Sequence, residues 1–433
     1  MKNSERLYKK YSEVSPGGVQ SNYRFEQPHP IYYKRAAGSK LWDIDDKEYL
    51  DFLIGYGSIV LGHADPRVRR AVIDALDAGM TSGVETELDF KLVDTLCKMV
   101  PSAEMARVCN SGTEAVMHAL MIARGYTGKD KIAKAEGGYH GWYDPVLVSY
   151  HPGFKEAGPE KNPLPIPASS GLDHAALGSS VIFPYNDAES ARRIITKNKD
   201  EIAAVMIEPI CFNTGALMPK KGFLEELREI TSELGIPLIF DEVITGFRIA
   251  PGGAQQYFNI KPDLSIFGKA IANGYPVSAI AGREDLINVS KPGGKVAYAG
   301  TYNGNQICAA ASSATLDVLK SGSIQKSLAR NTEFLRKKVE RLGEGRKYGI
   351  HFQGVGGKFQ IFFSDRVITN YRETMAVNAK MYAAFRKYML DNGVLFHYHE
   401  LFHHGITNAH TKEDLAGFVD RFGKFLDAYD RKN

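Results

Sequence analysis

Two charged residues stand at the ends of apolar runs that should form buried strands. The segment IPLIFDEVITGFR, residues 236–248, carries Asp241 and Glu242 directly after Leu, Ile and Phe. Further along, PDLSIFGKAIANG places Lys269 after a second apolar run. In an open parallel sheet, ligands bind outside the carboxyl ends of the strands, so an acid and an amine at two such ends can face one ligand. Alternatively, Asp241 could cap a helix or pair with Arg248, and Lys269 could be solvated.

An aspartate and a lysine facing one ligand are what pyridoxal 5'-phosphate (PLP) requires. The lysine holds the cofactor aldehyde as a Schiff base, and the aspartate keeps the pyridine nitrogen protonated. An adjacent negative charge favours the protonated nitrogen. The residues therefore predict a PLP-dependent enzyme with Lys269 and Asp241 as its catalytic residues.

A phosphate-binding turn should accompany this pair. The segment VCNSGTEAVMHALMIAR is typical of a strand, the turn Ser111-Gly112-Thr113 and a helix. The first amides of a helix and its dipole attract anions, and glycine lets the backbone approach them. Ser111 and Glu114 also form a capping box, which is compatible with phosphate binding because the cap fixes the start of the helix.

Aromatic residues follow a glycine pair in EGGYHGWYD. Tyr139, His140 and Trp142 can stack on a pyridine ring, or can simply cover the sheet. We expect Tyr139 and His140 to contact the cofactor.

The elements that must position these residues alternate along the middle of the chain. From about Pro66, helical patterns such as PRVRRAVIDALDAG alternate with apolar strands such as AAVMIEPI. Strands without polar alternation, separated by helices, indicate a parallel sheet covered on both faces. An antiparallel meander is predicted over residues 30–52, with turns near Gly38 and Asp45. After about residue 315, helices are predicted over 324–345 and 375–393, around a strand at 358–364.

Composition excludes several classes of function. The 433 residues are 44% hydrophobic, and 54 Lys and Arg against 50 Asp and Glu leave a net charge of +4 without a basic block. A nucleic-acid or membrane-surface partner is therefore not expected. The chain has no apolar leader and no run of about 18 apolar residues, so we expect a cytoplasmic protein.

Cysteines and histidines give no metal-site pattern. The four cysteines (Cys97, Cys109, Cys211 and Cys308) include no C-x-x-C pair, and we expect reduced, mostly buried thiols. HYHELFHH, residues 397–404, lacks regular ligand spacing, so we expect a substrate-pocket or surface loop rather than a metal site.

The motifs together resemble class III, fold-type I, PLP-dependent aminotransferases, most closely the branch that contains glutamate-1-semialdehyde aminomutase. The resemblance covers nearly the whole chain, through SPGGVQS, LWDIDDKEYLDF, NSGTEAVMHALMIARGYTGKDKI, EGGYHG, FDEVITGFR, PDLSIFGKAIANGYPVSAIAG and AGTYNGN. It implies an α/β fold with a large PLP-binding domain, residues 66–315, built on a mostly parallel seven-stranded sheet. Residues 1–65 and 316–433 would form a small α+β domain.

The resemblance also implies further cofactor contacts and a homodimer with shared active sites. Val243 and Tyr139 would lie on the two faces of the ring, with Gly112 and Thr113 at the phosphate. The remaining implied contacts are Asn213 near the ring hydroxyl, Glu208 as a supporting carboxylate, and Thr301 reaching the phosphate from the neighbouring subunit.

Substrate contacts follow the same resemblance. Arg24 matches the carboxylate-binding arginine of the aminomutase branch, and a guanidinium suits one carboxylate of glutamate, the expected amino donor. An exposed Arg in an N-terminal loop is the alternative. Three departures argue against the aminomutase itself. Tyr56 replaces the pocket tryptophan, Ala272-Asn273-Gly274 replaces three glycines, and Phe402 replaces the glutamate of the gating loop.

These departures favour an aminotransferase that exchanges its acceptor with solvent. Tyr56 and His399 would offer hydrogen-bond donors to a polar carbonyl acceptor. A sugar-derived aldehyde is expected, as in 8-amino-3,8-dideoxy-manno-octulosonate formation for lipopolysaccharide. The alternatives are glutamate-1-semialdehyde 2,1-aminomutase, a β-amino-acid aminotransferase and a catalytically idle PLP-binding regulatory protein.

Overall fold

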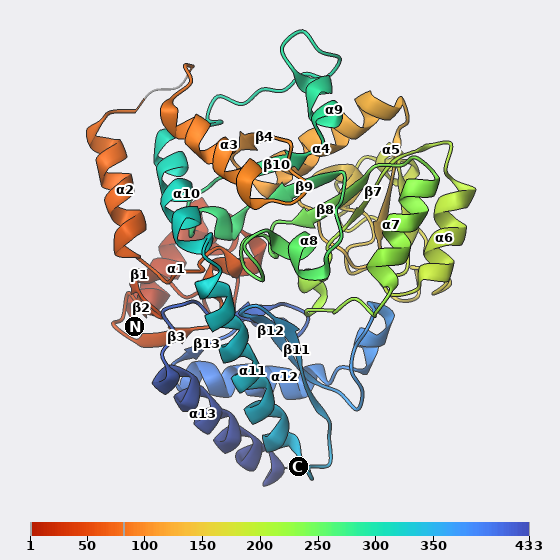
Figure 1. The fold of residues 1–433 in the computed structure, drawn as a ribbon. Coiled ribbons are helices and arrows are strands. Elements are labelled where there is room, and N and C mark those ends of the chain that lie inside the picture. Colours follow the sequence, from red (N-terminus) through yellow and green to blue (C-terminus); the bar gives the residue numbers. More distant parts are fainter. Residues whose placement is uncertain (1, 81–82, 433) are drawn as a thin grey trace.

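The computed structural model describes residues 2–80 and 83–432, and its centre is one seven-stranded sheet (Figure 1). The strand order is β4-β10-β9-β8-β7-β5-β6. The five strands from β9 to β6 are parallel, whereas β10 is antiparallel to both of its neighbours. The mostly parallel sheet expected from the sequence is confirmed. The bounds are β4 (Met105–Cys109), β5 (Lys131–Ala135), β6 (Ser180–Phe183), β7 (Ile202–Ile207), β8 (Leu238–Glu242), β9 (Leu264–Phe267) and β10 (Ser278–Gly282).

Both faces of this sheet are covered by helices, which explains its apolar strands. In β7 all six residues are buried. Val205 and Ile207 pack in the same core cluster as Leu227 of α7, whereas Met206 packs with Ala119 of α4, because successive residues of a strand face opposite sides. The helices of this region are α2 (Pro66–Asp77), α3 (Glu87–Met99), α4 (Gly112–Thr127), α5 (His174–Gly178), α6 (Ala188–Lys197), α7 (Phe223–Glu233), α8 (Gly253–Phe258), α9 (Glu284–Ile287) and α10 (Gln306–Leu319).

An N-terminal segment and a C-terminal segment form a four-stranded sheet with the order β1-β2-β3-β13. The first three strands form the expected antiparallel meander, and β13 pairs with β3 in parallel. A separate three-stranded sheet has the order β11-β12-β14. The bounds are β1 (Tyr33–Ala37), β2 (Lys40–Asp43), β3 (Glu48–Asp51), β11 (Ile350–Val355), β12 (Lys358–Phe363), β13 (Val394–Leu395) and β14 (His404–Gly405).

The remaining helices lie around these two sheets, and one begins later than the sequence pattern indicates. They are α1 (Asn3–Val14), α11 (Ser323–Gly343), α12 (Ala379–Asp391) and α13 (Lys412–Asp430). A helix was predicted over 375–393, but α12 begins at Ala379 because the side chain of Asn378 caps it by accepting from the amide of Met381. Across the described residues, none of the helices is long and apolar enough to cross a membrane.

Candidate active site

A cavity of about 320 Å³ opens where β8 and β9 end and α4 begins. This position, at the carboxyl ends of parallel strands, is where open α/β sheets bind ligands. Ten of the residues expected to bind the cofactor line it: Ser111, Gly112, Thr113, Tyr139, His140, Glu208, Asn213, Asp241, Val243 and Lys269. The structure therefore brings together residues that span most of the central sheet.

Asp241 is the second-to-last residue of β8 and is almost fully buried. One carboxylate oxygen, Oδ2, lies 2.7 Å from Nδ1 of His140, and Oδ1 accepts the amide of Val243 at 3.1 Å. His140 is itself buried, and its Nε2 has no hydrogen-bond partner among the described atoms. The histidine thus fixes one carboxylate oxygen while the side chain of Asp241 still lines the cavity.

Arg248 is not the partner of Asp241, so that alternative from the sequence is wrong. Its guanidinium donates to the carbonyl oxygens of Gly57 and Ile59, each at 2.8 Å. Burial lowers the pKa of Arg248 to about 9. The carboxylate of Asp241 remains available to a ligand.

Lys269 follows β9 in a left-handed backbone conformation, with φ of 48°. Such a conformation is uncommon for a residue with a side chain and is found at functional sites held by surrounding structure. Burial lowers the pKa of Lys269 to about 8, against the opposing effect of Glu208 and Asp241. The amine therefore has a much larger neutral fraction near neutral pH than a solvated lysine does.

The start of α4 forms an anion cradle. The hydroxyl of Ser111 accepts the amide of Glu114 at 3.3 Å, and the carboxylate of Glu114 accepts the amide of Ser111 at 3.0 Å. The expected capping box is confirmed. It leaves the amides of Gly112 and Thr113, the first two residues of the helix, without partners inside the helix.

Glycines allow close packing around this cradle. A Cβ on Gly141, whose φ is 95°, would come within 2.5 Å of Thr113 Oγ1. A Cβ on Gly112 would stand 3.3 Å from a methyl group of Val243. A side chain at either position would crowd Thr113 or Val243, which line the cavity.

Glu208 positions two other residues of the cavity. Its Oε1 accepts the amide of Tyr139 at 3.0 Å, and its Oε2 accepts Nδ2 of Asn213, also at 3.0 Å. Burial raises the pKa of Glu208. We conclude that Glu208 holds Tyr139 and Asn213 in place.

These residues fit PLP. Lys269 would hold the aldehyde, Asp241 would face the pyridine nitrogen, and the amides of Gly112 and Thr113 would bind the phosphate. The cavity reaches the start of α4, where Ser111, Gly112 and Thr113 line it. Bound there, PLP supplies an electron-withdrawing ring that acidifies the substrate carbon.

The expected substrate residues do not line the cavity; they are Arg24, Tyr56, His399 and Phe402. Aromatic side chains surround Tyr56 and Phe402. The ring of Phe402 lies 5.4 Å from Tyr56 and 5.4 Å from Tyr23, and it stacks on His397 at 4.1 Å. Tyr150 lies 4.9 Å from Tyr139. Sequence reasoning missed Tyr23 and Tyr150 because no local pattern separates them from ordinary aromatic residues.

Arg24 is exposed in the short helix Asn22–Arg24. Within residues 2–80 and 83–432, the structure gives its guanidinium no ion pair, whereas nearby Glu26 pairs with Arg386. The positive charge of Arg24 acts on the phenol of Tyr56, whose pKa burial raises to about 12. Among the described residues, Arg24 is thus a cation without an ion-pair partner, close to Tyr56.

The histidine segment is mostly buried, so of the two expected alternatives, a substrate-pocket loop and a surface loop, the surface loop is wrong. His397, His403 and His404 are buried, and Tyr382 donates to the carbonyl oxygen of His397 at 2.8 Å. His399 is more exposed, and its ring stacks on His151 at 6.0 Å.

Thr301 lies apart from the cavity of its own chain and is exposed. The cysteines are mostly buried, as expected, with Cys97 partly accessible.

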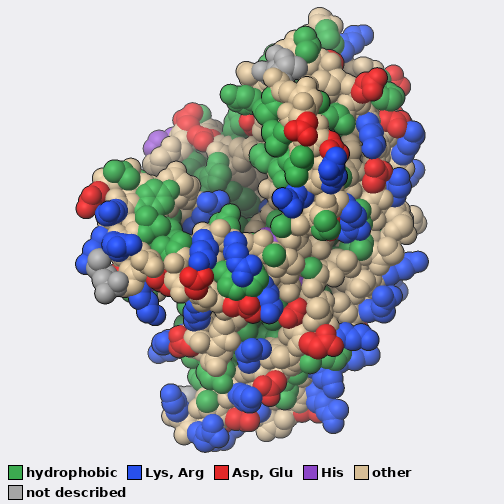
Figure 2. Space-filling model, turned by 90° about the vertical axis from the view of Figure 1, so that its left-hand side faces the viewer, with side chains coloured by type: hydrophobic (Ala, Val, Ile, Leu, Met, Phe, Trp, Pro, Cys, Tyr) green, Lys and Arg blue, Asp and Glu red, His purple; other side chains and the backbone are tan. Residues whose placement is uncertain are grey.

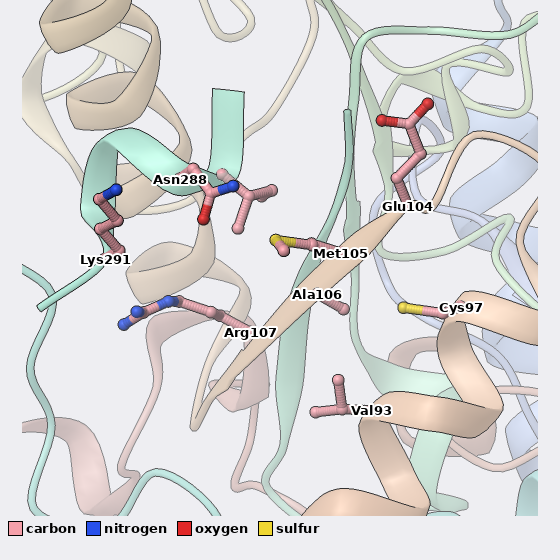
Figure 3. Close-up of a pocket in the computed structure, with 9 residues that line it drawn as sticks. Val93, Cys97, Glu104, Met105, Ala106, Arg107, Asn288 and Lys291 are labelled. Atoms are coloured by element: carbon pink, nitrogen blue, oxygen red, sulfur yellow. The ribbon is translucent and has the colours of Figure 1, made fainter. Parts of the chain in front are cut away.

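A second cavity, of about 310 Å³, lies at the edge strand β4 (Figure 3). Arg107 and Lys291 lie on one side of it, and Glu104 points away from them. Neither Lys269 nor Asp241 lines this cavity. It does not belong to the cofactor site.

The fold and the cavity together define a PLP-dependent transferase of fold type I. The family model "Aminotransferase class-III" matches residues 22–422, and the chain belongs to this family. A relative named glutamate-1-semialdehyde 2,1-aminomutase, from Methanobrevibacter smithii, is 40% identical over 95% of each chain.

Two solved transaminase structures are similar over nearly their full lengths. An ω-transaminase from Sphaerobacter thermophilus superposes with a TM-score of 0.94 at 33% identity, covering 98% of this chain and 97% of the other. A β-phenylalanine aminotransferase from Variovorax paradoxus gives a TM-score of 0.89 at 29% identity, covering 99% of this chain and 94% of the other.

Proposed function

We propose that this enzyme moves an amino group from a carboxylate-bearing donor, glutamate by preference, to a carbonyl acceptor supplied from solution. The observation that carries the proposal is the aromatic cluster of Phe402, Tyr56 and Tyr23, whose member Tyr23 lies 6.4 Å from Trp142, a neighbour of the cavity residue Tyr139. Phe402 packs between Tyr56 and Tyr23, at the position where the aminomutase resemblance implies a gating carboxylate. Without that carboxylate, the chain has one group fewer to retain a reaction intermediate. We therefore expect the intermediate to be released to solvent.

The chain's own residues account for the proton steps. The amine of Lys269, neutral in a large fraction of molecules near pH 8, takes a proton from the substrate carbon and returns it as a general acid. Asp241 would keep the pyridine nitrogen protonated, and His140 fixes the orientation of its carboxylate at 2.7 Å.

Glutamate alone should convert the purified, PLP-loaded protein from its aldehyde form to its amine form. The expected result is loss of the aldehyde absorbance band on titration with glutamate, and its return when a suitable carbonyl acceptor is added. A spectrum that glutamate leaves unchanged contradicts the glutamate-donor proposal. A screen of keto acids, β-keto acids and sugar-derived aldehydes against the amine form then identifies the acceptor.

A second candidate is the glutamate-1-semialdehyde 2,1-aminomutase reaction. The relative from Methanobrevibacter smithii favours it, and it has more support from the comparisons than a sugar transaminase has. The mutase requires no external donor. Isomerisation of glutamate 1-semialdehyde at full rate without added glutamate identifies this reaction and rejects the first candidate.

Arg24→Ala should raise the KM for glutamate by about tenfold or more and change kcat little. A charge-assisted bidentate pair with a carboxylate contributes roughly 1.5–3 kcal/mol, and the ground state and transition state share it. Steady-state kinetics with glutamate measure the effect. Arg6→Ala, which alters another N-terminal arginine, serves as the matched control, because Arg6 contacts Asn3 instead. An unchanged KM in Arg24→Ala removes this arginine from the site.

A homodimer is part of the proposal. Thr301 is exposed on its own chain and would reach the phosphate of a second copy. The face that includes α2 carries hydrophobic side chains beside a hollow (Figure 2). The exposed hydrophobic residues at or near α2 and α3 are Leu76, Met80, Val84 and Phe90. An apolar patch of this kind is typical of a protein interface.

A further inference from the structure

The side chains of Lys358, His403 and Arg248 lie close together inside the protein, and some of their nitrogens lack an acceptor among the described residues. Lys358 on β12 and His403 just before β14 are completely buried. Lys358 Nζ, both ring nitrogens of His403, and Nε of Arg248 have no hydrogen-bond partner in the described part of the chain. Buried polar groups are nearly always paired, so a cluster of unpaired nitrogens needs an explanation.

The cluster surrounds Gly57. A Cβ built on Gly57 would lie 3.5 Å from Lys358 Nζ and 3.8 Å from Cε1 of His403. Arg248 donates to the carbonyl oxygen of Gly57 from the same region. The next residue, Ser58, lines the PLP cavity. A Cβ at Gly57 would be in ordinary van der Waals contact with these side chains, so only backbone separates them from the cavity wall at Ser58.

Charge in this region is unbalanced. Burial lowers the pKa of Lys358, and the positive charges of Arg248 and Lys269 lower it further. Asp51 acts in the opposite direction, but its carboxylate is engaged. Its Oδ2 contacts His63 at 2.7 Å, and its Oδ1 accepts the amide of Leu53 at 2.8 Å.

We propose that Lys358, His403 and Arg248 form a subsite for a second carboxylate of the substrate, in addition to the carboxylate that Arg24 holds. This inference rests on the proposed function, because it selects dicarboxylic donors such as glutamate for that site. A carboxylate would supply acceptors to nitrogens that now have none, and charge-assisted bonds are the strong ones. Burial favours the neutral form of Lys358, whereas a bound carboxylate would favour the protonated form, so anion binding and protonation of Lys358 would support each other.

The test uses glutarate and valerate, which share a five-carbon chain but carry two carboxylates and one. Neither ligand is an amine, so their binding to the PLP-loaded protein does not depend on transamination. We expect glutarate to bind the wild-type protein at least about tenfold more tightly than valerate, measured by the ligand-dependent shift in Tm. In Lys358→Met and in His403→Leu, this preference should fall to about twofold or less.

Matched controls separate the subsite from general effects. Lys134→Met also removes a fully buried lysine, but Lys134 donates to the carbonyl oxygen of Val148 at 2.7 Å and should leave the glutarate preference unchanged. A preference that is absent in wild type, or retained in both Lys358→Met and His403→Leu, overturns the proposal. Chloride that protects as well as glutarate, at equal concentration, identifies a free-anion site and also overturns it. If glutamate fails to convert the cofactor while the glutarate preference follows Lys358, the proposed donor is wrong and the subsite stands.

Discussion

Lys269→Ala should lose turnover by at least about 10⁴-fold, the largest effect that we expect from a single substitution. General acid–base catalysis alone contributes up to about 10⁴, and covalent attachment of the cofactor adds to it. In the structure, Lys269 lines the cavity, and burial lowers the pKa of its amine to about 8 against the opposing effect of Glu208 and Asp241. Single-turnover kinetics on protein loaded with PLP measure the loss.

The cofactor spectrum provides the second readout for Lys269→Ala. The covalent absorbance band should vanish with turnover, although the anion cradle of Gly112 and Thr113 can still retain PLP noncovalently. Lys291→Ala, an exposed lysine at the second cavity, is the control and should retain turnover within about twofold. Full activity in Lys269→Ala would refute its assignment.

Much of the site could be predicted because it depends on local patterns with a fixed relation to the sheet. An apolar run followed by a charged residue identifies the end of a buried strand, and the ends of parallel strands meet at one edge. That rule places Asp241 and Lys269 in one cavity from their sequence positions alone. The capping pattern at Ser111 and Glu114 likewise predicts where α4 begins.

Other parts of the site depend on contacts between distant segments, which a single sequence does not encode locally. Asp241 takes His140 as its partner, and Arg248 takes carbonyl groups near Gly57. Nothing in the sequence around Lys358 indicates that its amine is buried without a hydrogen-bond acceptor. A lysine in a strand is ordinarily exposed, and here tertiary packing overrides that preference.

The strand β10 shows a different limit. Its five residues, Ser278–Gly282, are all buried and mostly small. Such a short segment has little β-branched or aromatic content, so its strand signal is weak. Its antiparallel pairing with β4 and β9 became visible only in the structure.

Asp241→Asn should lower kcat by about 10²–10³-fold while leaving PLP attached. The substitution keeps the shape of the side chain and removes its charge, so the pyridine nitrogen loses the group that favours its protonated form. Effects of about this size follow the removal of one preorganised electrostatic partner. Steady-state kinetics measure kcat, and the covalent absorbance band measures attachment through Lys269.

Asp263→Asn is the matched control for this charge removal. Asp263 precedes β9 at the opposite end of the same sheet, where its carboxylate accepts the amide of Leu238 at 2.8 Å and pairs with Arg228 and Arg283. Its loss should lower Tm, because the buried amide of Leu238 and the two arginines lose a charged acceptor, and should change kcat by less than about threefold. If Asp241→Asn instead lowers Tm and leaves kcat at the wild-type value, the acid is structural. In that case, the cofactor nitrogen is not its partner.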